Sequence, residues 1–100
     1  MNPELEKVMA AIPFGRENAV GRHELSARLG MGDRRMRKLI EEARAGGAII
    51  INDSDGHGYY QTDDLSEMER QYRQDTSRAM SILQRRKPLR DALKKAGRAV

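Results

Sequence analysis

Residues 32–47 read GDRRMRKLIEEARAGG, and this stretch decides which fold the chain is expected to adopt. Its apolar side chains recur at the i, i+3, i+4 and i+7 spacing that marks one face of an α-helix. They are Met36, Leu39, Ile40 and Ala43. The basic side chains fall on the opposite face and are Arg34, Arg35, Arg37 and Lys38. The pattern predicts a helix that buries one face and turns four cations outward, free of neighbouring acids, toward an anionic ligand.

Length and composition limit the fold to which this helix can belong. One hundred residues, 38% of them hydrophobic, suffice for one domain with a modest core. The chain has no cysteine and only two histidines, which lie far apart, so we expect no disulfide, no metal site and no cofactor. No apolar run approaches the ~20 residues of a membrane span, and no signal-peptide pattern is present. These features predict a cytoplasmic protein without a membrane partner, a small-molecule ligand or an enzymatic pocket.

The net charge of +4 is unevenly distributed. Residues 33–51 carry five basic and three acidic side chains, whereas residues 52–75 carry two basic and seven acidic ones. Residues 84–100 carry seven basic side chains and one acidic. Two basic zones separated by an acidic one favour a polyanionic ligand more than the net charge alone does, and a merely solvated surface is the alternative.

Helix signals open the chain. Asn2 is a good cap residue, and Pro3 suits the first helical position. Apolar residues follow at helical spacing, namely Leu5, Val8, Met9 and Ile12. Pro13 disfavours helical backbone at the residue before it, so the helix is expected to end there. Ala19 and Val20, after a loop, are expected to form a very short edge strand.

A second helix is predicted over residues 22–29, directly before the first stretch described. Gly30 can take the left-handed conformation that ends a helix, and Met31 can fill the core between the two helices. Gly32 or Asp33 can then cap the next helix. This order predicts a helix-turn-helix, with an ordinary helical hairpin as the alternative.

Strand character follows the second of these helices. Residues 48–51 read AIII, residues 52–58 are polar with two glycines, and residues 59–61 read YYQ, which predicts a β-hairpin. Helix, turn, helix and hairpin in this order resemble bacterial winged helix-turn-helix DNA-binding domains, particularly the biotin-repressor-like kind. The wing of that family commonly ends in Gly-any-Gly-Tyr, which residues 56–59 match. The resemblance covers residues 4–61.

The resemblance implies an α+β fold. A winged helix-turn-helix of three helices and a small hairpin wing would occupy residues 1–62, and a long C-terminal helix with a kink or break near Pro88 and a basic tail would occupy residues 63–100. The whole chain is also similar to small phage-encoded or prophage-encoded winged-helix proteins of bacteria. In this family the second helix of the motif enters the major groove. The DNA-binding positions implied here are Arg22, His23, Gly32, Arg34, Arg35, Arg37, Lys38 and His57.

Side-chain chemistry suggests separate roles for these cations. Arginine can form two parallel hydrogen bonds with guanine, worth ~1–3 kcal/mol of base discrimination, whereas lysine meets phosphate as a point charge. Because residues near the helix start usually reach base edges, we expect Arg34 and Arg35 to read bases. Either role is expected for Arg37 and Lys38. The phosphate contacts expected from the preceding helix are Arg22 and His23.

Two features depart from the family pattern. Gly32 replaces the usual capping serine, although its backbone N–H is left close to any phosphate there. In the wing, Asp53 and Asp55 would meet phosphates and only His57 opposes them, so contact between the wing and DNA is left open. These aspartates and Gly56 also match a fragment of a calcium loop, but the remaining ligands are absent and a polar turn is preferred.

A long helix of about 23 residues is predicted after the wing, capped by Thr62 or Asp63. Its apolar residues recur at alternating steps of three and four and are Leu65, Met68, Tyr72, Ala79 and Ile82. Asp75 interrupts this pattern. The surplus length is expected to pair two copies of the chain, with packing on its own domain and a frayed tail as the alternative. The dimerisation residues expected are Tyr72, Ala79, Ile82 and Leu83.

Pro88 is expected to kink or end this helix near Lys87, because proline lacks a backbone donor and clashes with the preceding turn. The basic tail beyond it would fold back on a partner, lie along DNA or stay disordered. We therefore expect a small bacterial or phage protein that binds double-stranded DNA, as a transcriptional regulator or a replication-origin factor. The alternative is a protein-interaction adaptor whose acidic wing and residues 63–69 dock a basic partner.

Overall fold

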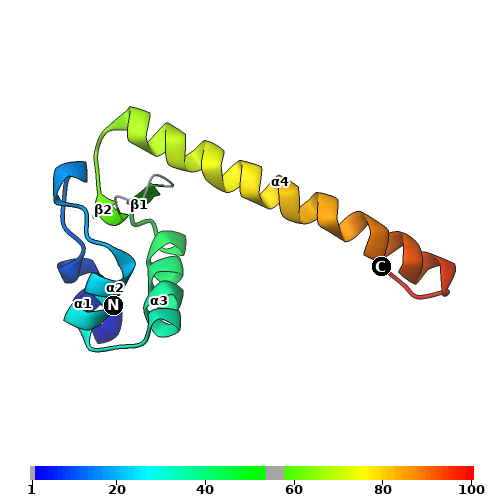
Figure 1. Cartoon of the computed structure of the whole chain (residues 1–100), viewed down its shortest axis with the longest axis horizontal. Coiled ribbons are helices and arrows are strands. Elements are labelled where there is room, and N and C mark those ends of the chain that lie inside the picture. The colour runs from blue at the N-terminus through cyan, green and yellow to red at the C-terminus, as the bar shows by residue number, and fades with distance from the viewer. Residues whose placement is uncertain (1, 54–57) are drawn as a thin grey trace.

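The computed structural model describes residues 2–53 and 58–100, and these form an α+β fold. In chain order the elements are helix α1 (Pro3–Ala11), the 3₁₀ turn η1 (Arg16–Asn18), helices α2 (Arg22–Leu29) and α3 (Asp33–Ala45), strands β1 (Ile50–Asp53) and β2 (Gly58–Gln61), and helix α4 (Leu65–Lys95). The first three helices gather at one end of the molecule, and α4 projects away from them (Figure 1). The α+β class and the order of elements agree with the prediction.

Local signals explain how the first three helices begin and end. The Asn2 side chain accepts a hydrogen bond from the Glu4 N–H at 2.8 Å, and Pro3 occupies the first helical position. Helix α2 ends at Gly30, whose φ of 64° is the left-handed conformation that glycine adopts without a steric penalty. The predicted turn is thereby confirmed. Gly32 is the N-cap of α3 and makes no side-chain bond there.

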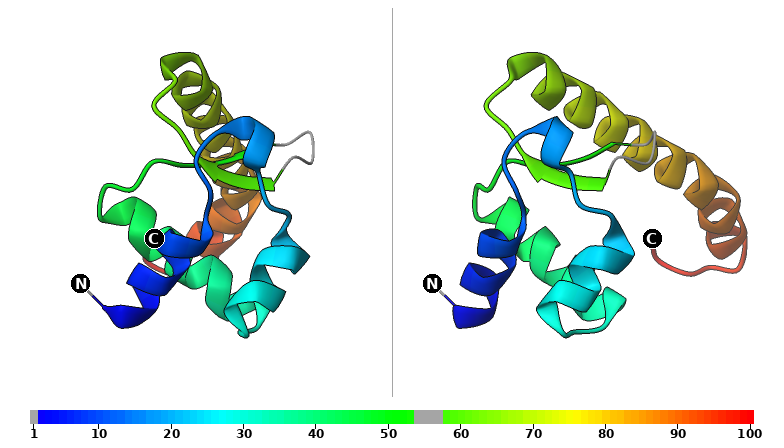
Figure 2. Two further views of the ribbon diagram at one scale, coloured as in Figure 1. Left: turned by 90° about the vertical axis from the view of Figure 1, so that its left-hand side faces the viewer. Right: turned by 60° about the vertical axis from the view of Figure 1, so that its left-hand side comes forward.

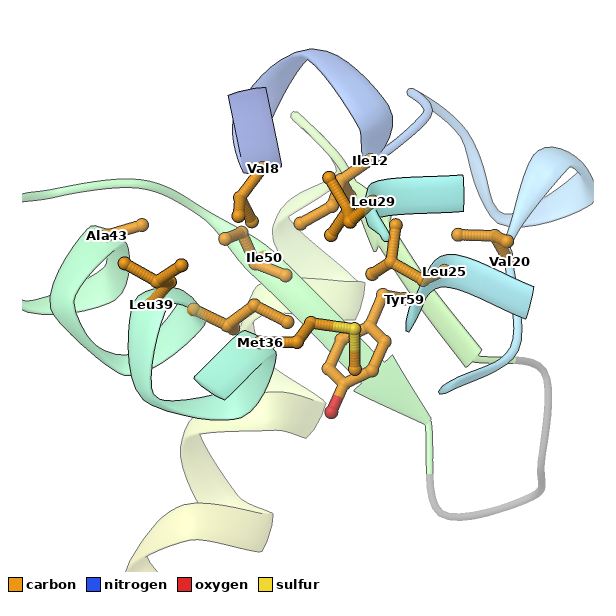
Figure 3. Close-up of a cluster of buried hydrophobic side chains, with 11 residues drawn as sticks. Val8, Ile12, Val20, Leu25, Leu29, Met36, Leu39, Ala43, Ile50 and Tyr59 are labelled. Carbon is orange, nitrogen blue, oxygen red and sulfur yellow. The ribbon is translucent and has the colours of Figure 1, made fainter. Parts of the chain in front are cut away.

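One apolar core joins α1, α2, α3 and the hairpin (Figure 3). The predicted apolar face of α3 is buried, with Met36 and Leu39 at 0% exposure. The other core residues are Val8, Ile12, Val20, Leu25, Leu29, Ile40, Ala43, Ile50 and Tyr59. Met31 in the turn packs against this cluster, as predicted. The cations of α3 therefore stand on a helix whose orientation the core determines.

The two strands pair antiparallel, with Ile51 opposite Tyr60. Because side chains alternate along a strand, Ile50 and Tyr59 face the helical core, and Ile51 and Tyr60 face the other way, toward α4. The views in Figure 2 show the hairpin lying between the helical cluster and α4. The first strand begins at Ile50, whereas the pattern had placed its start at Ala48.

The expected edge strand at Ala19 and Val20 is reduced to one bridge, in which Val20 pairs with Tyr59. Its two backbone hydrogen bonds measure 2.8 and 3.0 Å. Gly58 makes this approach possible, because its φ is 99° and a Cβ there would lie 2.3 Å from the Val20 carbonyl oxygen. The close approach of the Val20 backbone thus requires a glycine at position 58, the second glycine of the Gly-any-Gly-Tyr pattern.

The long helix differs from its prediction in two ways. Its N-cap is Asp64, which accepts hydrogen bonds from the backbone N–H groups of Ser66 and Glu67 at 2.8 and 3.2 Å, and not Thr62 or Asp63. Thr62 instead supports the cap by accepting the Asp64 N–H at 3.0 Å. Asp64 thus caps the helix and Thr62 holds the backbone of Asp64, whereas the pattern had predicted one capping residue.

Of the two outcomes expected near Lys87, a kink or an end of the helix, the end is wrong, because α4 continues through Pro88 to Lys95. Pro88 and its neighbours are exposed, so water can satisfy the carbonyl that loses its helical donor, and good helix formers follow on the next turn. The helix therefore has 31 residues and a length of ~46 Å at ~1.5 Å per residue. None of its residues is buried.

Helix α4 contacts the rest of the chain through polar groups near its start. The Gln71 side chain accepts the Asn52 N–H at 2.9 Å, and the Gln74 side chain donates to the Asn52 carbonyl at 3.4 Å. The Tyr60 hydroxyl donates to Glu67 at 3.1 Å. The C-terminal part of α4 stands apart from the domain (Figure 1). Within the described ranges, no helix has the length and apolar character needed to cross a bilayer.

Candidate nucleic-acid interface

The outermost cations of α3 are Arg34 and Lys38. They lie one turn apart, both are exposed, and they face away from the buried Met36 and Ile40. Among the residues that the structure describes, neither forms an ion pair. These two side chains match the expectation of free cations on the outer face of α3, and they form the centre of the candidate interface.

Arg35 departs from that expectation. Its guanidinium forms a two-point ion pair with Glu4 of α1, and the longer of the two bonds, from Nε to Oε2, measures 3.4 Å. The hydrogen bond from Arg35 lowers the pKa of the Glu4 carboxyl, and the same bond raises the pKa of Arg35. Arg35 lies on the flank of α3 that faces α1, because its position is about 100° from that of Arg34 on the helix. The prediction that this side chain is free of acids is wrong.

Asp33 similarly engages two of the predicted contact residues. It pairs with Arg37 at 2.9 Å and with Arg22, at the start of α2, at 3.1 Å. Both arginine side chains remain about half exposed. The expectation of free guanidinium groups therefore fails for Arg37 as well. Because both arginines bind the same carboxylate, Arg22 of α2 nevertheless lies beside Arg37 of α3.

A basic groove of about 510 Å³ runs along the flank of α3 that carries Arg37. Arg22 and His23 line it from α2, Arg37 and Arg44 from α3, and Arg78 from α4. The Arg44 guanidinium is held in place by hydrogen bonds of 2.9 and 3.1 Å to the Ile50 carbonyl. Among the described residues of this lining Glu41 is the acid, so their charge balance is positive and suits phosphate.

Sequence reasoning missed Arg44 and Arg78. Arg44 follows Ile40 by one helical turn and precedes the glycines that end α3, so its place on the flank of α3 was readable from the helical period. No local signal marks Arg78, because its place in the groove depends on the direction in which α4 crosses the hairpin.

The remaining predicted contacts are Gly32 and His57. Gly32 is exposed at the N-terminus of α3, where backbone N–H groups and the helix dipole favour an anion. His57 lies outside the described residues, as do Asp55 and Gly56. Within the described part of the chain, no group of three or more potential ligands could hold a metal ion.

The predicted dimerisation residues all lie on exposed parts of α4. Tyr72 is 74% exposed, and Ile82 and Leu83 are also large exposed apolar side chains. Ala79 lies between them on the same helix and is exposed. Beside Tyr72, an apolar groove of about 660 Å³ separates α4 from Ile49 and β1. Arg44 lines both this apolar groove and the basic groove, so the two lie next to each other.

The chain was compared with models of protein families, with curated proteins and with solved structures, and none of the three comparisons found a match.

Proposed function

We propose that this chain is a winged-helix protein that binds double-stranded DNA with α3 in the major groove. One observation carries the proposal: Arg34 and Lys38 have no ion-pair partner among the described residues, and they stand on the exposed face of a helix whose opposite face is buried. An α-helix fits the major groove, where base edges display a distinct pattern of donors and acceptors. The basic groove beside α3 extends the positive surface toward the phosphates.

The geometry favours a division of roles that differs from the sequence expectation. Arg34 is the base-reading candidate, because Arg35 is turned toward Glu4. Lys38, one turn further along, is placed for phosphate. Arg22 and Arg37 can exchange Asp33 for phosphate at low cost, because an exposed ion pair is worth only about 0–1 kcal/mol.

The competing function, docking of a basic protein, has less support. Two of the four acids that it would use in residues 63–69 are occupied within the chain: Asp64 caps the helix, and Glu67 accepts hydrogen bonds from Tyr60 and Thr62. Such internal bonds leave fewer free carboxylates for a partner. DNA binding would suit a transcriptional regulator or a replication-origin factor.

Selection of bound fragments from random duplex DNA, followed by anisotropy titrations with the selected site, tests the proposal. Arg34→Ala should cost ~1–3 kcal/mol and relax preference at one base position. Lys38→Ala should weaken binding to all sequences and reduce the salt slope by about 1. The matched control is Arg73→Ala, which removes a side chain that is 81% exposed on α4. Absence of DNA retention at low salt, or equal behaviour of all three variants, would overturn the proposal.

A further inference from the structure

A continuous seam runs along α4, and this chain leaves it largely uncovered. Its members follow one another at alternating steps of three and four residues, the repeat of a helix that pairs with another helix. The α4 seam consists of Leu65, Met68, Tyr72, Asp75, Ala79, Ile82, Arg86, Leu89, Leu93 and Ala96. Eight of these ten residues are apolar, and the two exceptions carry opposite charges. Tyr72 and Leu89 are 74% and 67% exposed.

The positions of the two charges select one arrangement of two copies. When two such helices run antiparallel with Asp75 opposite Arg86 of the second copy, Arg86 also meets Asp75 of the second copy by symmetry. In that register every remaining seam residue meets an apolar one. The pairs are Ala79 with Ile82, Tyr72 with Leu89, Met68 with Leu93, and Leu65 with Ala96.

Other registers separate the charges. Shifting the antiparallel pair by one heptad in either direction places Asp75 against Ala79 or Leu93, so that each charge meets an apolar side chain, which is costly. A parallel pair in register places Asp75 against Asp75 and Arg86 against Arg86, and like charges repel. Charge complementarity therefore favours a single antiparallel register.

The shape of the chain agrees with this register. The apolar groove beside the start of α4 is lined by Met68 and Tyr72 on one side and by Ile49 and Ile51 on the other. In the antiparallel register the residues of the second copy that face Met68 and Tyr72 are Leu93 and Leu89. Both leucines are exposed here, as is Ile49 at 45%. Pairing would remove these apolar surfaces from water together.

We infer that two copies of this chain form an antiparallel dimer through the α4 seam, with Asp75 paired to Arg86 across the interface and the leucines of each helix end seated in the groove of the other copy. This interface does not depend on DNA. On one flank of this interface, Glu69 lies beside Arg90 of the second copy and attracts it. On the other flank, Arg78 lies beside Arg85 of the second copy and repels it.

Sedimentation equilibrium tests the charge pairing. The wild-type chain should form a dimer, Asp75→Arg and Arg86→Asp should each weaken dimerisation by more than ~10-fold, and the double substitution should restore it. An equimolar mixture of the two single variants should form a heterodimer. The matched control is Asp91→Arg, which makes the same charge change on the outer face of α4. A wild-type chain that stays monomeric, or an Asp75→Arg variant that associates like the control, would overturn the inference.

Disulfide trapping tests the orientation, because the chain has no cysteine of its own. Glu69→Cys and Arg90→Cys place thiols on facing flanks of an antiparallel pair, whereas each thiol is ~28 Å or more from its own counterpart at ~1.5 Å per residue. Oxidation should link the two variants only when they are mixed. Linked dimers in either variant alone would show a parallel pair and overturn the inference. A dimer that fails to bind DNA would contradict the proposed function and leave this interface standing.

Discussion

The four adjacent cations of α3 differ in what surrounds them. Arg34 and Lys38 face solvent without an acidic partner among the described residues, Arg37 shares Asp33 with Arg22, and Arg35 binds Glu4 of α1. Their charge is similar, but Glu4 of α1 supplies an acid on one flank of the helix and Asp33 of α3 itself supplies an acid on the other. The unpaired side chains are therefore the ones that point farthest from the core.

The Glu4–Arg35 pair predicts a pH effect on stability. The pKa of Glu4 is lowered by Arg35 in the folded chain, so its contribution is present above the unfolded pKa and is lost as the pH falls through the folded pKa. Glu4→Gln should therefore lower the urea midpoint slightly at neutral pH and have no effect at strongly acidic pH. Glu6→Gln, on the same helix, is the control. A Glu4→Gln effect that persists in acid would contradict the expectation.

Among the elements, α4 depends most on a few residues at one end. Asp64 caps it, Thr62 supports the cap, and Gln71 and Gln74 attach its first half to β1. The remainder relies on its own backbone hydrogen bonds, or on a second copy. A helix of this length without a buried residue is unusual for a monomer, because amphipathic packing normally supplies most helical stability.

Loss of the cap should therefore affect the start of α4 first. Asp64→Ala should cost about 1 kcal/mol of unfolding free energy and speed amide exchange at Ser66 and Glu67, whose N–H groups lose their acceptor. Asp63→Ala, one residue earlier, removes the same charge without removing that acceptor. Equal effects of the two variants on the Ser66 amide would mean that charge near the helix start, and not the hydrogen bond, is what stabilises α4.

At the scale of the molecule, the described chain measures 51 × 30 × 24 Å, with the helical domain at one end and α4 extending from it. Gln71 and Arg78 lie on the side of α4 that faces this domain. In the inferred dimer a two-fold axis relates the two α4 helices, and the domain-facing sides of both helices point in the same direction. Both domains therefore lie on one side of the helix pair. Arg78 and Arg85 of both copies then lie between the domains, where a duplex would pass.

Arg85→Gln should therefore have opposite effects on the two inferred associations. Dimerisation without DNA should become tighter, because two like-charge contacts are lost. DNA affinity should fall, and the salt slope should decrease by about 2, because each copy gives up about one phosphate contact. Arg98→Gln, on the tail, is the control. If Arg85→Gln changes neither dimerisation nor DNA affinity, the arrangement of domains derived from the dimer is wrong.

Most of the local structure could be read from the sequence. The period of the apolar residues identified the buried face of α3, and Asn2, Pro3 and Gly30 marked helix ends, because caps and helical spacing act over about four residues. The hairpin followed from the β-branched run and the turn residues. Pro88 misled the prediction, because one missing donor on an exposed helix is tolerated when water satisfies the freed carbonyl.

The sequence by itself determined the order of the helices and of the hairpin, which face of α3 is buried, and which side chains carry charge, since each depends on near neighbours in the chain. Only the tertiary structure decided that Arg35 meets an acid 31 residues away and that Arg78 reaches the groove beside α3. It also decided that the α4 seam is left open. These outcomes depend on how α1 and α4 cross the rest of the fold, and packing between distant segments sets those crossings.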